Sequence, residues 1–424
     1  MEDSNINYDD LFGQVKALKK VLLVVGGGRV GSDFFQSLLD GHYQILQVTG
    51  ACFLHHWWKE AKCKDKLSDL IDEFIWYTRF PSNHIAKFKS YYNKQERWDQ
   101  LGINKDDFFE VDIDSFKVHM LNILANKELN SRNFILAVHL AYGLATGVDI
   151  RKVRILFYHA HQIEQLKDFR DDFPDFDVVC SIREPRNALV SSVDHWKKYD
   201  ILNTYNMKSF YYFINRIFKG AEPLLQYTKN FKSLKLEDLH LFSKEVLEEF
   251  CKMYSLEFQN SMFESSYQGK KWWGDSLSGK YLDGFSDNIK NKKWRNRLFS
   301  YDNFLIEFIL EERLKHYGYP IENKLSRFHL IPAIFLAFLP MKYELEIFKF
   351  SLKNKAQRRA LFLICENLLF YLLRVSLYLK LIGKKINKKT FLANFFTQKQ
   401  SLKARSIKGT VDEAFQQQEV VSSN

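Results

Sequence analysis

Cysteine and proline are both scarce in this sequence of 424 residues. The chain has 7 prolines and 46% hydrophobic residues, a composition that excludes global disorder and provides for a sizeable core. None of the five cysteines forms a CxxC pair, which excludes a disulfide framework and a structural zinc site, so we expect no metal and a reduced compartment. The cysteines are Cys52, Cys63, Cys180, Cys251 and Cys365. The opening MEDSNINYDD lacks the apolar run of a secretory signal, and we expect a cytoplasmic protein.

The sequence also lacks an even distribution of positive charge. The formal net charge is +11, but residues 321–410 carry 18 Lys and Arg against 4 Asp and Glu, whereas residues 1–320 carry 44 of each sign. The excess therefore belongs to one C-terminal segment, and we expect no nucleic acid partner.

Short apolar segments alternate with helical patterns over residues 1–320. Apolar residues at three- and four-residue spacing indicate the helices, and the alternation predicts an α/β domain with a parallel sheet covered on both faces. The predicted strands are 21–25, 44–48, 134–138, 154–158, 177–182 and 233–236. The predicted helices include 163–172, 188–198, 209–219, 244–254 and 303–317.

The character of the chain changes after residue 320. The apolar run 331–339 is too short to span a bilayer, which needs about 20 residues. The run 360–383 is long enough but includes Glu366, Arg374 and Lys380, and charges are costly at the bilayer centre. We therefore expect residues 321–398 to form a basic helical extension that packs on the domain or lies on an anionic membrane surface, followed by a disordered tail over 399–424.

A glycine-rich turn follows the first predicted strand in VLLVVGGGRVGSDFF (21–35). Such a turn presents backbone amides to an anion, and its spacing fits a dinucleotide site, another phosphate site, or a tight turn without a ligand. A dinucleotide site needs an acidic residue after the second strand, where this sequence has Thr49 and Gly50. A Walker loop needs a Lys before the Ser; here Arg29 lies inside the turn, and its guanidinium can bind phosphate or sulfate oxygens in a fork.

A second arginine-bearing turn occurs in CSIREPRNALVSSVDHW (180–196). Arg183 ends a predicted buried strand, and Ser191 follows eight residues later on the next helix. Either residue alone is more often structural, but together they can converge on one anion.

These two stretches resemble the sulfotransferases that use 3′-phosphoadenosine 5′-phosphosulfate, over roughly residues 20–320. The stretch 28–33 stands where that family binds the 5′-phosphosulfate, and IREPRNALVSS is similar to its 3′-phosphate motif. The segments 235–258 and 292–320 resemble two further family motifs, the second through Trp294 and Arg295. The resemblance implies a fold like that of the P-loop NTPases and a metal-free nucleotide site. The implied cofactor-binding residues are Gly28, Arg29, Val30, Gly31, Ser32, Asp33, Arg183, Ser191, Trp294 and Arg295.

The sequence departs from the family pattern at three positions. Val30 replaces the usual Ser, Asp33 a Thr, and Leu236 a Tyr. An Asp in the first turn of a phosphate-binding helix opposes the anion unless it points away or is paired. A catalytically decayed nucleotide-binding protein therefore stays an alternative, beside an NAD(P)-binding Rossmann oxidoreductase.

Sulfuryl transfer needs cations on the leaving oxygens and a base near the acceptor. Arg29 is the expected stabiliser of the leaving phosphate. The expected base is His159 or His161, since the cytosolic branch of the resembled family has its catalytic His 22 residues before the arginine of the 3′-phosphate motif, which falls on His161.

The acceptor is expected to be a glycan or a similar small molecule with a hydroxyl group. Two aromatic clusters can stack on such acceptors, although aromatic pairs are as often core residues. The candidate substrate residues are His55, His56, Trp57, Trp58, Trp272 and Trp273, and the two histidines are also alternative bases. As partners we also consider a homodimer and a peripheral contact of residues 321–398 with the cytoplasmic face of a membrane.

Overall fold

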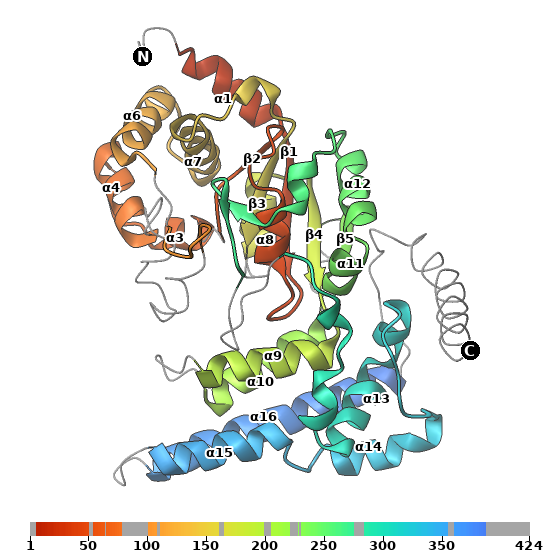
Figure 1. Cartoon of the computed structure of the whole chain (residues 1–424). Helices are drawn as coiled ribbons and strands as arrows, with labels where there is room; N and C mark the ends of the chain where they lie inside the picture. Colours follow the sequence, from red (N-terminus) through yellow and green to blue (C-terminus); the bar gives the residue numbers. More distant parts are fainter. Residues whose placement is uncertain are drawn as a thin grey trace, which may run out of the picture.

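The computed structural model describes residues 6–50, 54–63, 65–78, 101–107, 111–160, 165–198, 205–220, 228, 230–274, 284–354 and 360–386. Its centre is a five-stranded parallel sheet in the order β2-β3-β1-β4-β5 (Figure 1). The strands are β1 (Lys19–Val25), β2 (Ile45–Gln47), β3 (Ile155–Ala160), β4 (Phe176–Ile182) and β5 (Phe231–Lys235). The predicted α/β class is confirmed, including a strand–glycine turn–helix unit of the P-loop kind on the central strand.

The strand order bears on the oxidoreductase alternative. In this sheet β3 lies directly beside β1, with Val21 opposite Phe157. The classic dinucleotide-binding sheet has the order 3-2-1-4-5-6, in which the second strand adjoins the first. The topology therefore contradicts the Rossmann reading, in agreement with the missing ribose-binding acid.

Side chains alternate between the two faces of the sheet because strand residues point in opposite directions in turn. Leu22, Val24 and Tyr158 belong to the larger core on one face, and Leu23 and Phe157 to the smaller core on the other. The smaller core is covered by α2 (Ser32–Leu38), α11 (Leu236–Leu241) and α12 (Ser243–Met253). The larger core is covered by α1 (Tyr8–Ala17), α3 (Leu54–Glu60), α4 (Leu67–Thr78), α6 (Ile113–Leu124), α7 (Ser131–Ala145), α8 (Gln165–Asp172), α9 (Pro185–Lys198), α10 (Met207–Lys219) and α13 (Ser300–His316).

One predicted strand, 134–138, is wrong. These residues lie inside α7, whose N-terminus is capped by the side chain of Asn130, which accepts a hydrogen bond from the Asn133 amide. All five residues are buried, and a helix buried on all sides gives the same continuous apolar run as a central strand.

A two-stranded hairpin, β6 (Ser266–Tyr267) and β7 (Lys270–Lys271), packs on α2. Its turn residues Gln268 and Gly269 both have positive φ, the geometry of a tight hairpin turn. Asp40 fixes the hairpin by accepting hydrogen bonds from the Ser266 hydroxyl at 2.9 Å and the Gly269 amide at 2.8 Å.

Three C-terminal helices complete the described chain: α14 (Leu330–Leu336), α15 (Lys342–Asn354) and α16 (Ala360–Ile386). In Figure 1 the strands point downward, and these helices lie at the lower end, below α9 and α10. Helix α16 packs along α10 and also contacts α13, α14 and α15. No helix in the described ranges is long and apolar enough to cross a bilayer. The tail 399–424 lies outside the described residues.

Candidate nucleotide site

The glycine turn between β1 and α2 is bonded to the end of β4. The Gly26 amide donates to the Ser181 carbonyl at 2.9 Å, and the Ser181 hydroxyl donates to the Val30 carbonyl at 3.0 Å. Arg29 and Gly31 have left-handed φ values of 54° and 81°. The turn is therefore held at the carboxyl edge of the sheet, where ligands of open α/β folds bind.

Two glycines of the turn are needed for packing. A Cβ atom on Gly28 would lie 2.3 Å from Cε2 of Phe213, and one on Gly31 would lie 2.2 Å from Cδ1 of Leu236. The turn thus packs against α10 on one side and the start of α11 on the other.

We expect Gly31→Ala to lower the free energy of unfolding by at least about 2 kcal/mol, because a left-handed non-glycine residue costs roughly 1–2 kcal/mol before the clash with Leu236 is counted. Gly13→Ala is the matched control: it lies in α1 with no other atom within 4 Å of the new Cβ, and we expect it to be neutral or stabilising. Urea denaturation measures both. Equal effects of the two variants would contradict the described turn.

The structure brings Arg29 and Arg183 together. Nη1 of Arg183 donates to the main-chain carbonyl of Arg29 at 3.1 Å. Burial lowers the pKa of Arg183, the charge of Arg29 lowers it further, and Glu237 opposes the shift. Two guanidinium groups at one sheet edge repel each other, and a doubly charged anion between them relieves this repulsion.

Two buried donors at this edge have no hydrogen-bond partner among the described residues. They are Nε of Arg183 and Oγ of Ser192, whose side chain is 2% exposed. Oγ of Ser192 also lies 3.0 Å from the position of a Cβ on Gly28, directly beside the turn. Buried polar atoms are normally paired, so these two are consistent with a ligand or water at the turn.

Glu237 supports the segment that carries Arg183. Its carboxylate accepts hydrogen bonds from the Glu184 amide at 2.9 Å and from the Tyr319 hydroxyl at 3.2 Å. Burial raises the pKa of Glu237, while the Glu184 amide and the charge of Arg183 oppose the shift. The turn after β4 is thereby tied to α11 and to the end of α13.

An aromatic cluster lies near Arg183. The rings of Phe34 and His240 stack with centroids 4.7 Å apart and an interplanar angle of 9°, and Phe285 meets Phe34 edge-on. Burial and the charge of Arg183 lower the pKa of His240 to about 4. His240 is therefore neutral at physiological pH. Together with Phe34 it forms a flat aromatic surface of the kind on which a nucleobase can stack.

A cavity of about 40 Å³ lies behind the turn, against Val30, Arg183, Arg313, Tyr317 and Tyr319. A cavity of this size has room for ordered water.

Each described histidine that we expected as a base or substrate residue lies against another polar side chain, and His159 is the residue before the last of β3. His159 is 1% exposed on β3, and its Nδ1 is 2.8 Å from Oε1 of Gln36. His161 lies outside the described residues. His55 is buried against α8, with Nε2 3.0 Å from Oδ2 of Asp172, and His56 is an exposed residue beside Glu60.

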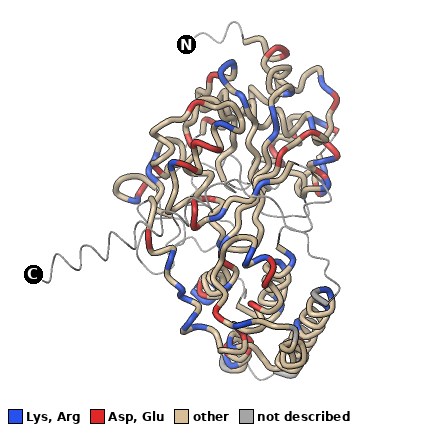
Figure 2. Tube along the Cα trace, turned by 90° about the vertical axis from the view of Figure 1, so that its right-hand side faces the viewer, with Lys and Arg blue, Asp and Glu red and all other residues tan. Residues whose placement is uncertain are grey.

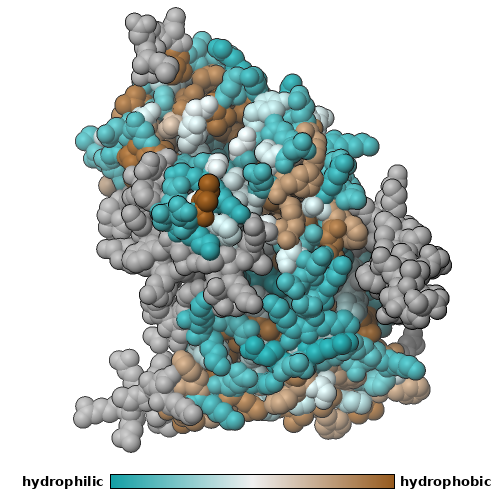
Figure 3. Space-filling view, in the orientation of Figure 1, coloured by the Kyte–Doolittle hydropathy of each residue, from teal (hydrophilic) through white to brown (hydrophobic). Residues whose placement is uncertain are grey.

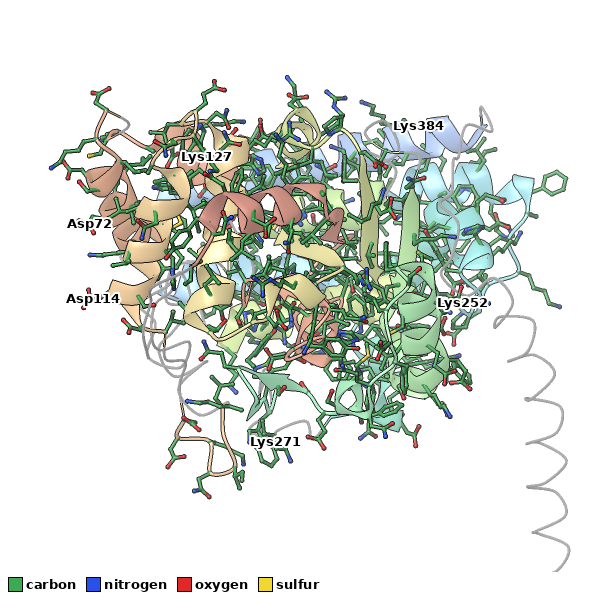
Figure 4. All side chains as sticks on the ribbon, turned by 90° about the horizontal axis from the view of Figure 1, so that it is seen from above. Asp72, Asp114, Lys127, Lys252, Lys271 and Lys384 are labelled. Atoms are coloured by element: carbon green, nitrogen blue, oxygen red, sulfur yellow. The ribbon has the colours of Figure 1, made fainter. Side chains whose placement is uncertain are left out.

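The tryptophans expected to contact substrate lie in two separate places. Trp57 is fully buried between Phe74 and Phe134, and Trp58 packs on its edge, so this pair contributes to the core. Trp272 is buried behind the hairpin. The ring of Trp273 lies between Lys105 and Lys271, with the ammonium groups 4.6 and 3.9 Å from its centroid. Figure 4 places Lys271 on the opposite side of the molecule from Lys384 of α16.

Trp294 and Arg295 are not brought to the glycine turn. Trp294 is 2% exposed, and its ring stacks under Arg186, with the guanidinium carbon 3.9 Å from the centroid. Arg295 lies at the surface and pairs with Glu322. Trp294 therefore helps to hold Arg186, the second arginine of IREPR, in place. Arg186 is fully buried and also bonds Glu184, Glu307 and Asn303.

The remaining cofactor candidates lie on or near the turn. Val30 and Ser32 are buried, Asp33 lies in the first turn of α2 with its carbonyl accepting from Tyr267, and Ser191 is half-buried on α9. Sequence reasoning missed Ser192, Glu237, His240 and Phe34. A charged Glu-Asp pair directly after a buried strand was a usable signal for Glu237, but nothing in the sequence placed His240 against Phe34.

No protein-family model matches the sequence, and no curated protein matches it at a significant level. Among solved structures, the chain is similar to a sulfotransferase domain from the Synechococcus olefin synthase (12% identity, 66% of this chain and 88% of that one, TM-score 0.36). It is also similar to a sulfotransferase domain from the curacin biosynthetic pathway (13%, 73% and 94%, TM-score 0.32) and to a sulfotransferase from Mycobacterium avium (12%, 60% and 72%, TM-score 0.29). Sequence identities and TM-scores as low as these do not establish a shared function. In the described part of the chain, no three His, Cys, Asp or Glu side chains are grouped so as to hold a metal.

Proposed function

We propose that this chain is a sulfotransferase that transfers a sulfuryl group from 3′-phosphoadenosine 5′-phosphosulfate to a hydroxyl of a glycan or similar acceptor. The observation that carries the proposal is the contact between Arg183 and the Arg29 turn at the carboxyl edge of the sheet. One arginine comes from each of the two motifs, and an adenylate with phosphates at both ends of its ribose needs a cation at each end.

The unpartnered donors fit a nucleotide of this kind. Nε of Arg183 and Oγ of Ser192 are donors, as an anionic oxygen requires. In the proposal Arg183, with Ser191 and Ser192 of α9, holds the 3′-phosphate, and Arg29 holds the 5′-phosphosulfate. The stacked rings of Phe34 and His240 offer the adenine an apolar surface.

When bound, the donor nucleotide supplies the sulfuryl group and a phosphate as its leaving group. Arg29 stabilises the charge that develops on the leaving oxygens, because a fixed guanidinium needs no reorganisation at the moment of transfer. His161 is the proposed base that takes the acceptor proton, since His159 is buried on a sheet face and bonded to Gln36.

A transfer assay tests the proposed activity. Donor nucleotide labelled with ³⁵S is incubated with the full chain and with pools of hydroxylated glycans, and label is followed into the acceptor. We expect transfer that is lost in Arg29→Met. Binding of adenosine 3′,5′-bisphosphate without transfer to any pool would instead favour the catalytically decayed protein that Val30 and Asp33 suggest.

The pKa of His240 reports where the anion binds. We expect adenosine 3′,5′-bisphosphate to raise this pKa from about 4, because a nearby phosphate stabilises the imidazolium and offsets the charge of Arg183. NMR titration of the histidine rings measures the shift. His139, whose pKa burial inside α7 also lowers to about 4, is the control and should not change. An unchanged His240 in the nucleotide-bound protein would place the anion elsewhere.

A further inference from the structure

We propose that the outward face of α14, α15 and α16 binds the surface of an anionic lipid bilayer. We call this the C-terminal face and define it by its exposed apolar side chains. They are Phe328, Ile331, Phe335, Phe338, Leu339, Leu345, Phe348, Leu352, Ile364, Leu368, Leu369, Leu372 and Leu373. The proposal is independent of the transfer chemistry.

The C-terminal face concentrates the exposed apolar surface of the molecule. Only four other large hydrophobic residues are exposed in the described ranges: Ile103, Val118, Leu121 and Tyr212. In Figure 3 apolar side chains gather along the lower edge, over the helices that Figure 1 places there, while the surface directly above is hydrophilic. Contiguous exposed patches of this kind indicate an interaction site.

Each helix contributes a stripe with helical spacing. Leu345, Phe348 and Leu352 recur on α15, and Leu368 and Leu372 on α16, where they are 54% and 53% exposed. A helix packed only in a water-soluble domain would turn its polar side outward. These helices turn an apolar side outward, as interfacial helices do.

The arginine of the apolar run 360–383 is turned inward. Arg374 is one of the charged residues that argued against a membrane span over 360–383. It is fully buried and bonds the Glu344 carboxylate through Nε at 2.9 Å and Nη2 at 2.7 Å. It also donates to the carbonyls of Ala337 and Leu339. Its polar groups are thus satisfied between the helices, and Arg374 places no charge on the exposed side of α16.

The exposed charges on these helices favour an anionic partner. Among the residues 330–384 whose burial the structure describes, the exposed charged side chains are Lys349, Lys380 and Lys384. Glu346 and Glu366 are half-buried, like Lys342, and Glu344 is buried. Figure 2 shows mostly Lys and Arg over this lower part, and both signs over the sheet-bearing part. A second copy docked on the same face would oppose lysines to lysines, but anionic headgroups are complementary to them.

Vesicle co-sedimentation with the full chain tests the proposal. We expect binding to vesicles of phosphatidylcholine mixed with phosphatidylglycerol, and weaker binding to phosphatidylcholine alone. Leu368→Ser with Leu372→Ser should lower the partition constant about tenfold or more, because two apolar side chains that would be buried in the membrane interface are removed. Lys380→Glu with Lys384→Glu should lower it by at least about fivefold per lysine on the mixed vesicles, with less effect at high salt.

The matched control is Val118→Ser with Leu121→Ser, which replaces two similarly exposed apolar residues on α6. It should leave the partition constant unchanged, and circular dichroism of all variants checks that they fold. Equal loss in the α6 variant, or no vesicle binding by the unmodified chain, would overturn the proposal. So would a dimer in solution that Leu368→Ser with Leu372→Ser converts to a monomer, since that would make a second copy the occupant of the face.

Discussion

Arg183→Met weakens the binding of adenosine 3′,5′-bisphosphate about 100-fold, the largest effect that we expect from one side chain on ligand affinity. Hydrogen bonds to charged groups contribute about 1.5–3 kcal/mol each, and Arg183 offers its unpartnered Nε besides its charge. Arg183→Lys should recover part of the affinity, because the charge remains but the fork is lost. Calorimetric titration gives the three dissociation constants.

The control for this effect is Arg170→Met, which removes an exposed arginine of α8 that pairs with Asp171. It should bind the bisphosphate like the unmodified chain. Because Arg183 donates to the Arg29 carbonyl, the thermal unfolding of Arg183→Met is compared with that of Arg170→Met before the affinities are compared. A folded Arg183→Met variant that keeps its affinity would exclude this edge as the phosphate site.

Arg186→Met lowers the free energy of unfolding by about 3–5 kcal/mol, the largest effect that we expect on stability. Removing one partner of a buried ion pair leaves the other charge without compensation. Arg186 is fully buried, stacks on Trp294, and bonds the carboxylates of both Glu184 and Glu307. Urea denaturation followed by two probes, to establish a single transition, measures the difference.

Arg295→Met is a closely matched control. Arg295 flanks the same Trp294 ring at 6.0 Å and also forms an ion pair, with Glu322, but its side chain is 56% exposed. Exposed pairs contribute up to about 1 kcal/mol, so we expect a change within that range. Similar losses from the two variants would mean that Arg186 is not the central support of the β4–α9 turn.

The fold class could be predicted because the apolar strands are separated by helical patterns and bounded by turn residues. The segment 134–138 could not be assigned correctly, because burial on all sides removes the polar face that reveals a helix. Which side of α16 faces the solvent could not be predicted from the sequence either. The partner of Arg374 is Glu344 on another helix, and only the packed structure shows that the charge is internal.

The site was predictable where a short motif fixes both residue and place. Arg29 and Arg183 each follow a buried strand, and parallel strands end at one edge, so their meeting follows from the topology. Trp294 could not be placed in this way, because its stacking partner Arg186 comes from a distant segment. The neutral ring of His240 likewise depends on Phe34, Phe285 and Arg183, which come from three other parts of the chain.

Calorimetry of the unmodified chain with adenosine 3′,5′-bisphosphate, adenosine 5′-monophosphate and NAD tests most directly whether Arg29 and Arg183 hold the two phosphates of one adenylate. The account predicts micromolar binding of the bisphosphate, at least about tenfold weaker binding of the monophosphate because the partner of Arg183 is missing, and no binding of NAD. Equal affinity for the two adenylates, or preference for NAD, would contradict it.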